Sequence, residues 1–315
     1  MSQAPGMVFM GTPDFAVPSL EVMIKSKYKL LAVVTQPDRP RGRGKKVIPS
    51  PVKKVAQEHG IPVLQPHKLT ADFVQEIKGL APEVIVVAAY GKFLPKSLLE
   101  IPLLGCINVH ASLLPGYRGA APVHRVIMNG EKVTGVTIMY MAEGMDTGDI
   151  ILQRETEISP QENVGSLHDR LSLMGAGLLG IALQKLAAGC APKIERDSSL
   201  VTYAPPLKGE EEVINWEENA EIIHNQVRGM NPWPGAYTLW EGHRVKIWSS
   251  FVVEHEVKGN PGEIIELRND SILVSAGRGA LSIQELQLSG GKKMSVEDFL
   301  RGNRLTTGTV LGGFS

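Results

Sequence analysis

The stretch CINVHASLLPGYR, residues 106–118, carries the most information about the fold of this chain. Asn108 and His110 end an apolar run, and side chains two residues apart in a strand share one face. An amide and an imidazole are therefore expected to point the same way from a strand end. The SLLPG residues that follow cannot continue a strand. Polar side chains at the junction of a strand and a loop are typical of the sites of open α/β sheets.

The segments around this stretch alternate between expected strands and expected helices. Residues 84–89 form a continuous apolar run, as in a strand buried on both faces. This alternation predicts an α/β fold whose parallel sheet has right-handed crossovers. The expected strands are 7–10, 30–35, 84–89, 104–110 and 133–141; the expected helices are 15–25 with Asp14 as N-cap, 51–59, 70–80 and 164–186, and 36–51 is expected to be a long loop.

The second half of the chain has a different character. Residues 187–212 are rich in Pro, Gly, Ser and charge, which is typical of a linker. Beyond residue 236, short alternating segments predict a small antiparallel barrel of the oligonucleotide/oligosaccharide-binding (OB) type. These segments are 237–240, 245–253, 262–266, 272–275 and 281–288. We therefore expect a first domain over 1–188, a linker over 189–210 and a second domain over 211–315.

Composition excludes several classes of protein. The 315 residues carry no net charge and 43 % are apolar, which is typical of a globular protein without a general affinity for nucleic acid. No apolar run has transmembrane length, and no basic segment precedes the first apolar stretch as in a signal peptide. Cys106 and Cys190 are expected to be reduced thiols in the cytoplasm. No Cys/His cluster has zinc spacing, so no metal is expected.

One local charge cluster stands out. Residues 38–54 contain seven basic side chains against a single carboxylate, and a solvated surface is the ordinary explanation for such a run. Basic side chains next to a strand-end site would equally suit the phosphates of an RNA. Composition leaves both interpretations open. The basic residues are Arg39, Arg41, Arg43, Lys45, Lys46, Lys53 and Lys54.

Taken together, several segments resemble the methionyl-tRNA formyltransferase family over essentially the whole chain. They are GTPDFA (11–16), TQPDRP (35–40) followed by GRGKK (42–46), AYG (89–91), GCINVH (105–110), SLLP (112–115), YRGAAP (117–122), GVTIM (135–139), DTGD (146–149) and NPWPG (231–235). The resemblance implies a Rossmann-like formyltransferase domain followed by an OB-like tRNA-binding domain. It also implies transfer of the formyl group of 10-formyltetrahydrofolate to the α-amine of initiator methionyl-tRNA, by a cytoplasmic monomer that needs no metal or membrane.

Three residues suit the chemistry of formyl transfer. The formyl oxygen becomes anionic during the reaction, and one positioned donor to such an oxygen contributes roughly 3–4 kcal/mol. Asn108 can supply an amide N–H, and His110 has an imidazole whose unperturbed pKa is about 6.5. A carboxylate beside that ring would favour its protonated form, and Asp146, in the GMDTG loop, is the candidate. The resemblance assigns the same three residues to catalysis.

The other expected contacts depend more heavily on the resemblance, which places tetrahydrofolate at the SLLP loop and the tRNA acceptor end at the basic loop. The expected folate contacts are Ser112, Leu113, Leu114 and Pro115, with Tyr90, Gly91, Phe93 and Leu94 as pocket walls; for Phe93 and Leu94, ordinary core positions are the alternative. The expected tRNA contacts are Arg39, Arg41, Arg43, Lys45 and Lys46, with Arg43 at the position of the family's key arginine.

Three other functions stay open from the sequence. A folate-dependent formyltransferase acting on a small-molecule amine would share Asn108, His110 and Asp146, but would not need the basic loop and a separate barrel. Hydrolysis of formyltetrahydrofolate would use water as the acceptor. An RNA-binding protein on a degenerate transferase fold would not need the three residues intact.

Overall fold

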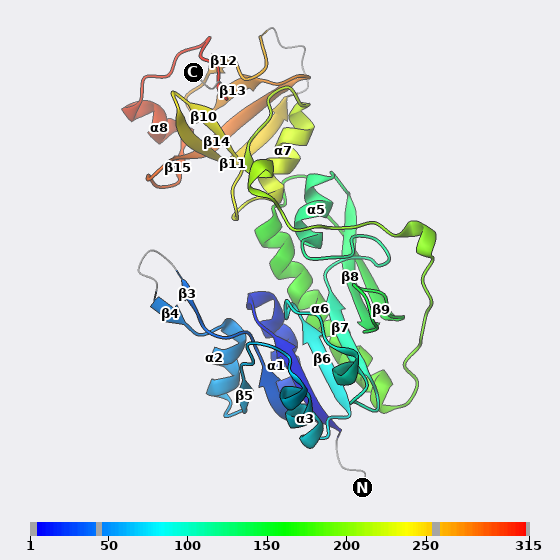
Figure 1. Cartoon of the computed structure of the whole chain (residues 1–315). Coiled ribbons are helices and arrows are strands. Elements are labelled where there is room, and N and C mark those ends of the chain that lie inside the picture. Colours follow the sequence, from blue (N-terminus) through cyan, green and yellow to red (C-terminus); the bar gives the residue numbers. More distant parts are fainter. Residues whose placement is uncertain (1–4, 42–45, 254–258, 313–315) are drawn as a thin grey trace. The chain divides into compact units, whose positions relative to one another are not determined.

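The computed structural model describes residues 5–41, 46–253 and 259–312, with only the backbone of Arg41 and Lys46. The chain forms two compact units, which are described separately (Figure 1). The first comprises Met1–Pro122, Val133–Thr156 and His168–Pro205, and the second comprises Val123–Lys132, Glu157–Leu167 and Pro206–Ser315. Two short segments from within residues 1–188 thus belong to the second unit, and the expected domain boundaries stay a prediction.

The first unit contains a seven-stranded sheet (Figure 1). Its first five strands in spatial order pair in parallel, which confirms the expected α/β class, whereas β8 runs antiparallel to β7. In spatial order the strands are β5 (Val63–Leu64), β2 (Lys29–Val34), β1 (Gly6–Gly11), β6 (Val84–Ala88), β7 (Cys106–His110), β8 (Val133–Tyr140) and β9 (Ile150–Glu157).

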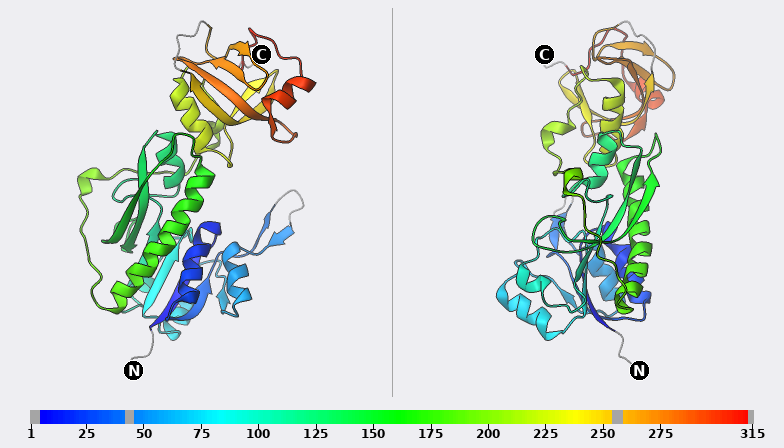
Figure 2. Two further views of the ribbon diagram at one scale, coloured as in Figure 1. Left: turned by 180° about the vertical axis from the view of Figure 1, so that it is seen from behind. Right: turned by 90° about the vertical axis from the view of Figure 1, so that its right-hand side faces the viewer.

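Helices cover both faces of this sheet, as the side view in Figure 2 shows. The hydroxyl groups of Ser50 and Thr70 cap α2 (Pro51–Glu58) and α3 (Ala71–Gly79) by accepting from the backbone N–H three residues on. The expected cap at Asp14 is wrong, because Asp14 lies inside a 3-10 turn, Asp14–Ala16, and α1 begins only at Val17. The helices with residues in this unit are α1 (Val17–Lys25), α2 (Pro51–Glu58), α3 (Ala71–Gly79), α4 (Lys96–Leu99), α5 (Pro122–Met128) and α6 (Val164–Ala187).

The two faces of β7 pack against different helices. Cys106 lies under α4, where its Sγ is 3.8 Å from the Leu98 carbonyl oxygen. Val109 lies on the opposite face against α6, where a Cβ added to Gly175 would come within 2.7 Å of Val109 Cγ1. The alternation expected from the sequence therefore holds, and Asn108 and His110 belong to the same face as Cys106.

The segment expected to be a loop over 36–51 contains a two-stranded ribbon, which corrects that expectation. Strands β3 (Arg39–Arg41) and β4 (Lys46–Ile48) are antiparallel, with Arg39 opposite Ile48. Figure 1 shows the ribbon leaving the body of the first unit. Arg43 and Lys45 lie outside the described residues.

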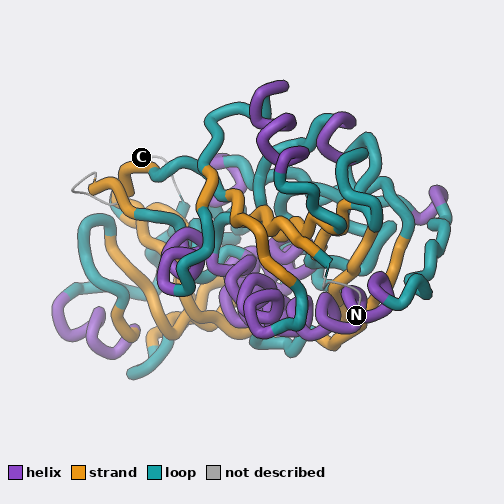
Figure 3. Tube along the Cα trace, turned by 90° about the horizontal axis from the view of Figure 1, so that it is seen from below, coloured by secondary structure: helices purple, strands orange, loops and turns teal. Residues whose placement is uncertain are grey.

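The second unit is built on a curled antiparallel sheet, as expected for an OB-like domain. Figure 3 shows the helices, strands and loops of the described residues in separate colours. In spatial order the strands are β10 (Tyr237–Trp240), β11 (His243–Val253), β14 (Ala280–Leu288), β13 (Ile272–Ser275) and β12 (Ile264–Leu267), with β15 (Met294–Ser295) beside β14; the helices are α7 (Ala220–Gly229) and α8 (Val296–Gly302).

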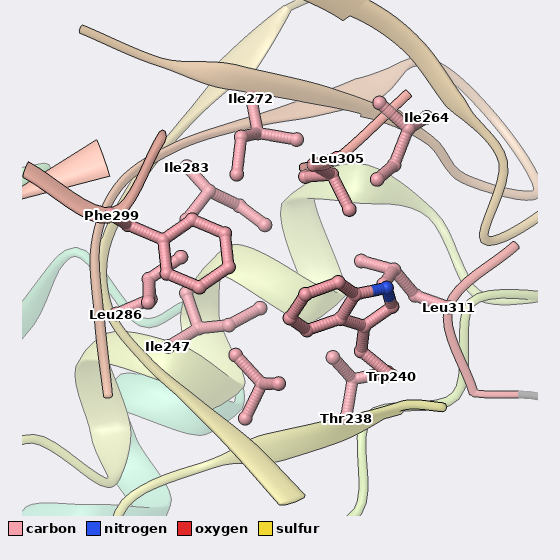
Figure 4. Close-up of a pocket in the computed structure, with 11 residues that line it drawn as sticks. Thr238, Trp240, Ile247, Ile264, Ile272, Ile283, Leu286, Phe299, Leu305 and Leu311 are labelled. Atoms are coloured by element: carbon pink, nitrogen blue, oxygen red, sulfur yellow. The ribbon is translucent and has the colours of Figure 1, made fainter. Parts of the chain in front are cut away.

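The core of the second unit encloses a small cavity of about 20 Å³ (Figure 4). The atoms that line it are apolar, and the rings of Trp240 and Phe299 meet edge to face at 5.6 Å. An apolar gap of this size is a packing feature rather than a ligand site. In the described part of the chain, no helix is long and apolar enough to span a membrane.

Candidate active site

Strand β7 brings Asn108 and His110 to one end of the first unit's sheet. His110 is 6 % exposed, and the Asn108 side chain is half-buried. No described residue forms a hydrogen bond with the Asn108 side-chain amide. An uncommitted amide beside a buried imidazole can donate to a ligand oxygen without first breaking a protein contact.

Asp146 lies next to His110, as expected from the sequence. The His110 Nδ1 atom is 3.7 Å from Asp146 Oδ1, and the side chains are only 7 % and 14 % exposed. The other ring nitrogen, Nε2, lies 3.2 Å from the Tyr117 carbonyl oxygen. Because a carbonyl oxygen can only accept, this contact assigns a hydrogen to Nε2. Nδ1 is therefore the ring nitrogen that faces the carboxylate.

The Asp146 carboxylate is held by its surroundings. Oδ2 accepts a hydrogen bond of 2.9 Å from the Gly119 N–H, and the Asp146 carbonyl accepts from the guanidinium of Arg196. The backbone of Asp146 has a φ of +50°, a left-handed conformation that is uncommon for a residue other than glycine. Residues in such conformations persist where their neighbours hold them, and they cluster at functional sites.

The SLLP loop is fixed to the neighbouring strands by side chains. Thr137, on β8, donates to the Ser112 carbonyl at 2.7 Å and accepts from the Leu114 N–H at 3.1 Å. Gln153, on β9, donates to the Leu114 carbonyl at 2.7 Å, and the Leu114–Pro115 peptide is cis. The four expected folate contacts therefore share one loop, which begins two residues after His110.

The expected pocket walls after β6 separate into buried and exposed residues. Tyr90 and Leu94 are buried, at 2 % and 9 % exposure, whereas Phe93 is 71 % exposed. Burial raises the pKa of the Tyr90 phenol to about 12. The Tyr90 hydroxyl has no hydrogen-bond partner among the described residues. Gly91 has a φ of +79°, which a side chain would strain. Because Phe93 is exposed, the alternative that it occupies an ordinary core position is wrong.

The base of the β3–β4 ribbon is tied to the sheet by a polar cluster. Lys53 Nζ lies 2.5 Å from Asp38 Oδ2 and 2.7 Å from Gln65 Oε1, and the Gln65 amide donates to Asp38 Oδ1 at 2.7 Å. Asp38 accepts hydrogen bonds from Lys53 and Gln65, and both lower the pKa of its carboxyl, with Lys53 having the larger effect. The Gln36 amide in turn donates to the Tyr90 carbonyl at 3.0 Å. The ribbon that carries the basic residues is thus attached beside the expected pocket wall.

Several contacts at this site were not anticipated from the sequence. Thr137 and Gly119 belong to quoted motifs, GVTIM and YRGAAP, without an expected role. Arg196 lies in a segment expected to be only a linker, and no spacing or motif marks it. Among the described residues, no three His, Cys, Asp or Glu side chains are grouped to hold a metal.

Comparison with known proteins gives the same family over both parts of the chain. Residues 7–180 match Formyl transferase, and residues 206–304 match Formyl transferase, C-terminal domain. The chain is 52 % identical over 308 residues to the methionyl-tRNA formyltransferase of Desulforamulus reducens, covering 97 % of each chain. It is 50 % identical over 307 residues to that of Moorella thermoacetica, covering 97 % of this chain and 99 % of the relative.

Solved structures share the fold at lower sequence identity. An N-formyltransferase from Helicobacter canadensis, in complex with folinic acid and dTDP-3-aminofucose, has a TM-score of 0.66 and 21 % identity and covers 92 % of this chain and 100 % of its own. HypX from Aquifex aeolicus, in complex with tetrahydrofolic acid, has a TM-score of 0.61 and 17 % identity. The match covers 98 % of this chain and 51 % of the HypX chain. These similarities concern the fold alone.

Proposed function

The chain belongs to the formyl transferase family, and within it to the methionyl-tRNA formyltransferases, and we propose that it transfers the formyl group of 10-formyltetrahydrofolate to the α-amine of initiator methionyl-tRNA. In this reaction the formyl carbon loses its bond to the folate N10 and gains a bond to the amine. One proton moves from the amine to the folate nitrogen. We place the reaction in the cytoplasm and assign it to a monomer.

The folate is proposed to bind at the SLLP loop, against Tyr90, Gly91, Phe93 and Leu94. The unpaired, buried hydroxyl of Tyr90 supports this assignment, since buried polar groups usually have partners. The loop held by Thr137 and Gln153 supports it further, since binding sites are usually preformed. When bound, the folate supplies the activated formyl group.

Asn108 is proposed to donate a hydrogen bond to the formyl oxygen as its negative charge grows. His110, whose two ring nitrogens face Asp146 and the Tyr117 carbonyl, is proposed to polarise that oxygen through the positive charge of its ring. Asp146 stabilises the charged imidazole and helps to move the proton that leaves the amine to the folate nitrogen. The observation that carries this proposal is the 3.7 Å separation of His110 Nδ1 and Asp146 Oδ1 in a buried setting next to the uncommitted Asn108 amide. A low local dielectric strengthens such interactions. Because the polar groups are already in position, they do not have to reorganise during the reaction.

The ribbon is proposed to bind the acceptor end of the tRNA through Arg39, Arg41, Arg43, Lys45 and Lys46. The cluster of Asp38, Lys53 and Gln65 supports this, because it fixes the base of the ribbon in place. Cationic side chains displace counterions from phosphates, so this contribution to binding should weaken as salt increases.

One assay tests the proposed reaction. The protein is supplied with 10-formyltetrahydrofolate and, in separate reactions, methionyl-tRNA, uncharged tRNA, glycinamide ribotide or water. We expect the formyl group on methionyl-tRNA alone. Formylation of the ribotide would instead indicate a small-molecule formyltransferase, and formate release without an acceptor would indicate a hydrolase.

A further inference from the structure

The segment that joins the two units, residues 190–205 (the connecting segment), is attached to the first unit by main-chain hydrogen bonds. Ile194 and Ile150 exchange two hydrogen bonds of 2.9 Å at the start of β9. Farther along, the Ala204 N–H donates to the Arg118 carbonyl at 2.7 Å, and the Arg118 N–H donates to the Thr202 carbonyl at 2.9 Å. Figure 2 shows the segment running along the side of the first unit. It therefore behaves as an added strand at two points.

One side chain of the connecting segment reaches the Asp146 loop. Arg196 donates from Nη1 to the main-chain carbonyl of Asp146. Burial lowers the pKa of Arg196, as does the nearby positive charge of Arg118, whereas the carboxylates of Asp146 and Asp149 act in the opposite direction. A cation placed against another cation in a partly desolvated position opposes folding unless a specific contact offsets that cost. The hydrogen bond to the Asp146 carbonyl is such a contact, and the nearby carboxylates of Asp146 and Asp149 add to it.

The connecting segment also contacts the Tyr117–Gly119 backbone, which in turn contacts both His110 and Asp146. The Thr202 hydroxyl accepts from the Tyr117 N–H at 2.9 Å, and the Tyr117 carbonyl is the partner of His110 Nε2. Two residues later, Gly119 donates to Asp146 Oδ2. A Cβ on Gly119 would lie 2.7 Å from the Ala204 carbonyl oxygen, so the segment packs directly on this backbone.

We propose that the connecting segment is part of the catalytic apparatus, with Arg196 and Thr202 as positioning residues that hold the Asp146 loop and the Tyr117–Gly119 backbone against His110. This inference rests on the proposed roles of His110 and Asp146. Arg196 fixes Asp146 through its main chain, and Thr202 fixes the carbonyl that orients the imidazole. Neither side chain contacts the reacting atoms.

The test compares variants that remove each contact with variants that keep it. Arg196→Met and Thr202→Val remove the donor and the acceptor, whereas Arg196→Lys and Thr202→Ser retain them. We expect the first pair to lower kcat roughly 10- to 100-fold, as small displacements of catalytic groups do. The KM for 10-formyltetrahydrofolate should change less than threefold, about 0.65 kcal/mol, since ground-state binding is not involved. The second pair should recover most of the lost kcat.

Lys193→Met is the matched control. It removes an exposed cation from the same segment, three residues before Arg196, without touching Asp146. We expect its kcat to match that of the unaltered protein. Circular dichroism and thermal unfolding of each variant report whether the fold survives. If Arg196→Met does not fold, the comparison of Thr202→Val with Thr202→Ser decides the question.

Asp146→Asn, measured in parallel, separates this inference from the function on which it rests. Loss of kcat in Asp146→Asn together with near-normal kcat in folded Arg196→Met and Thr202→Val would overturn the positioning role and leave the proposed reaction standing. Normal kcat in Asp146→Asn would overturn the proposed role of Asp146 itself. Equal losses in the removing and the retaining variants would also overturn the inference, because the specific hydrogen bonds would then be irrelevant.

Discussion

The Nδ1 atom of His110 lies 3.7 Å from Oδ1 of Asp146, and the two residues are contributed by β7 and by the loop that follows β8. The sheet thus brings together an imidazole and a carboxylate that are 36 positions apart in the sequence. Asp146→Asn keeps the size of the side chain but removes its charge and its capacity to receive a proton. We expect kcat to fall at least about 100-fold, the scale of general acid–base catalysis.

The affinity of Asp146→Asn for folate should change little, because the expected folate contacts lie on the SLLP loop and after β6. Single-turnover formyl transfer and equilibrium binding of the folate measure the two quantities separately. Turnover within a few-fold of the unaltered protein would remove Asp146 from the catalytic residues.

Asn108→Ala tests the donor on the formyl oxygen. The variant removes a half-buried amide that has no partner among the described residues, so little folding stability should be lost. Loss of one donor to a developing oxyanion lowers kcat by roughly 100- to 1000-fold. Steady-state kinetics with methionyl-tRNA provide the measurement. A variant that instead raises KM and keeps its kcat would assign Asn108 to ground-state binding.

The basic ribbon is tested by Arg43→Ala. We expect the KM for methionyl-tRNA to rise and the slope of log K against log salt to fall by about 0.7 to 0.9, the value for one lost phosphate contact. Folate binding should be unchanged. Lys27→Ala is the control, because Lys27 is an exposed cation just before β2, at the opposite end of that strand from the ribbon. The same salt slope in both variants would contradict a specific contact at Arg43.

The buried position of His224 leads us to expect that the second unit loses stability in mild acid. Its Nε2 donates to the Pro160 carbonyl at 3.3 Å, and its Nδ1 lies 3.0 Å from the Ser250 hydroxyl. Burial lowers its pKa in the folded state. The unfolded chain therefore binds more protons below about pH 6.5, and the free energy of unfolding falls by up to about 1.4 kcal/mol per pH unit until the folded pKa is reached.

Urea unfolding at a series of pH values between 8 and 5 measures this dependence. His224→Gln should be less stable at pH 8 and should lose the part of the slope that lies just below pH 6.5. His243→Gln is the control, because His243 is exposed. A slope unaltered by His224→Gln would show that another group is responsible.

The cavity in the second unit predicts a stabilising substitution. Val245 lines the cavity of about 20 Å³ and is buried. Val245→Ile adds one methylene group to that space, and cavity filling commonly adds about 0.5–2 kcal/mol to the free energy of unfolding. Ile247→Val enlarges the same cavity and should cost about 0.5–1.5 kcal/mol. Thermal unfolding of both variants checks the prediction, and a lowered Tm in Val245→Ile would show that the gap cannot accept a carbon atom.

Much of the fold was predictable because strong patterns occupy long segments. The apolar run of β6 and the alternating strands β10 to β14 were placed within a few residues. Two strands of the first sheet were missed for physical reasons. Strand β5 has only two residues, and β9 has charged side chains along its exposed part, so neither shows an apolar period.

The three proposed catalytic residues could be predicted from the sequence, whereas the residues that hold them in position could not. Asn108 and His110 share a strand, so their common face follows from the alternation of strand side chains. The position of Asp146 beside His110 was predicted from the DTGD motif and from the glycine-containing loop in which it lies. Arg196 bonds to the backbone of Asp146, 50 positions away, and Thr202 bonds to that of Tyr117, 85 positions away. No local sequence pattern encodes such pairings.

The contact of Gly119 with Ala204 sets a rule for building hybrid proteins from this family. Residues up to Pro205 complete the first unit, so a chimera that exchanges Pro206–Ser315, together with Val123–Lys132 and Glu157–Leu167 of the second unit, should have its final junction after this proline. A junction placed earlier, for instance at the end of α6, would pair a foreign strand with the native Arg118–Ala121 backbone. Such grafts should express as folded but catalytically slow proteins, even when both parents are fully active.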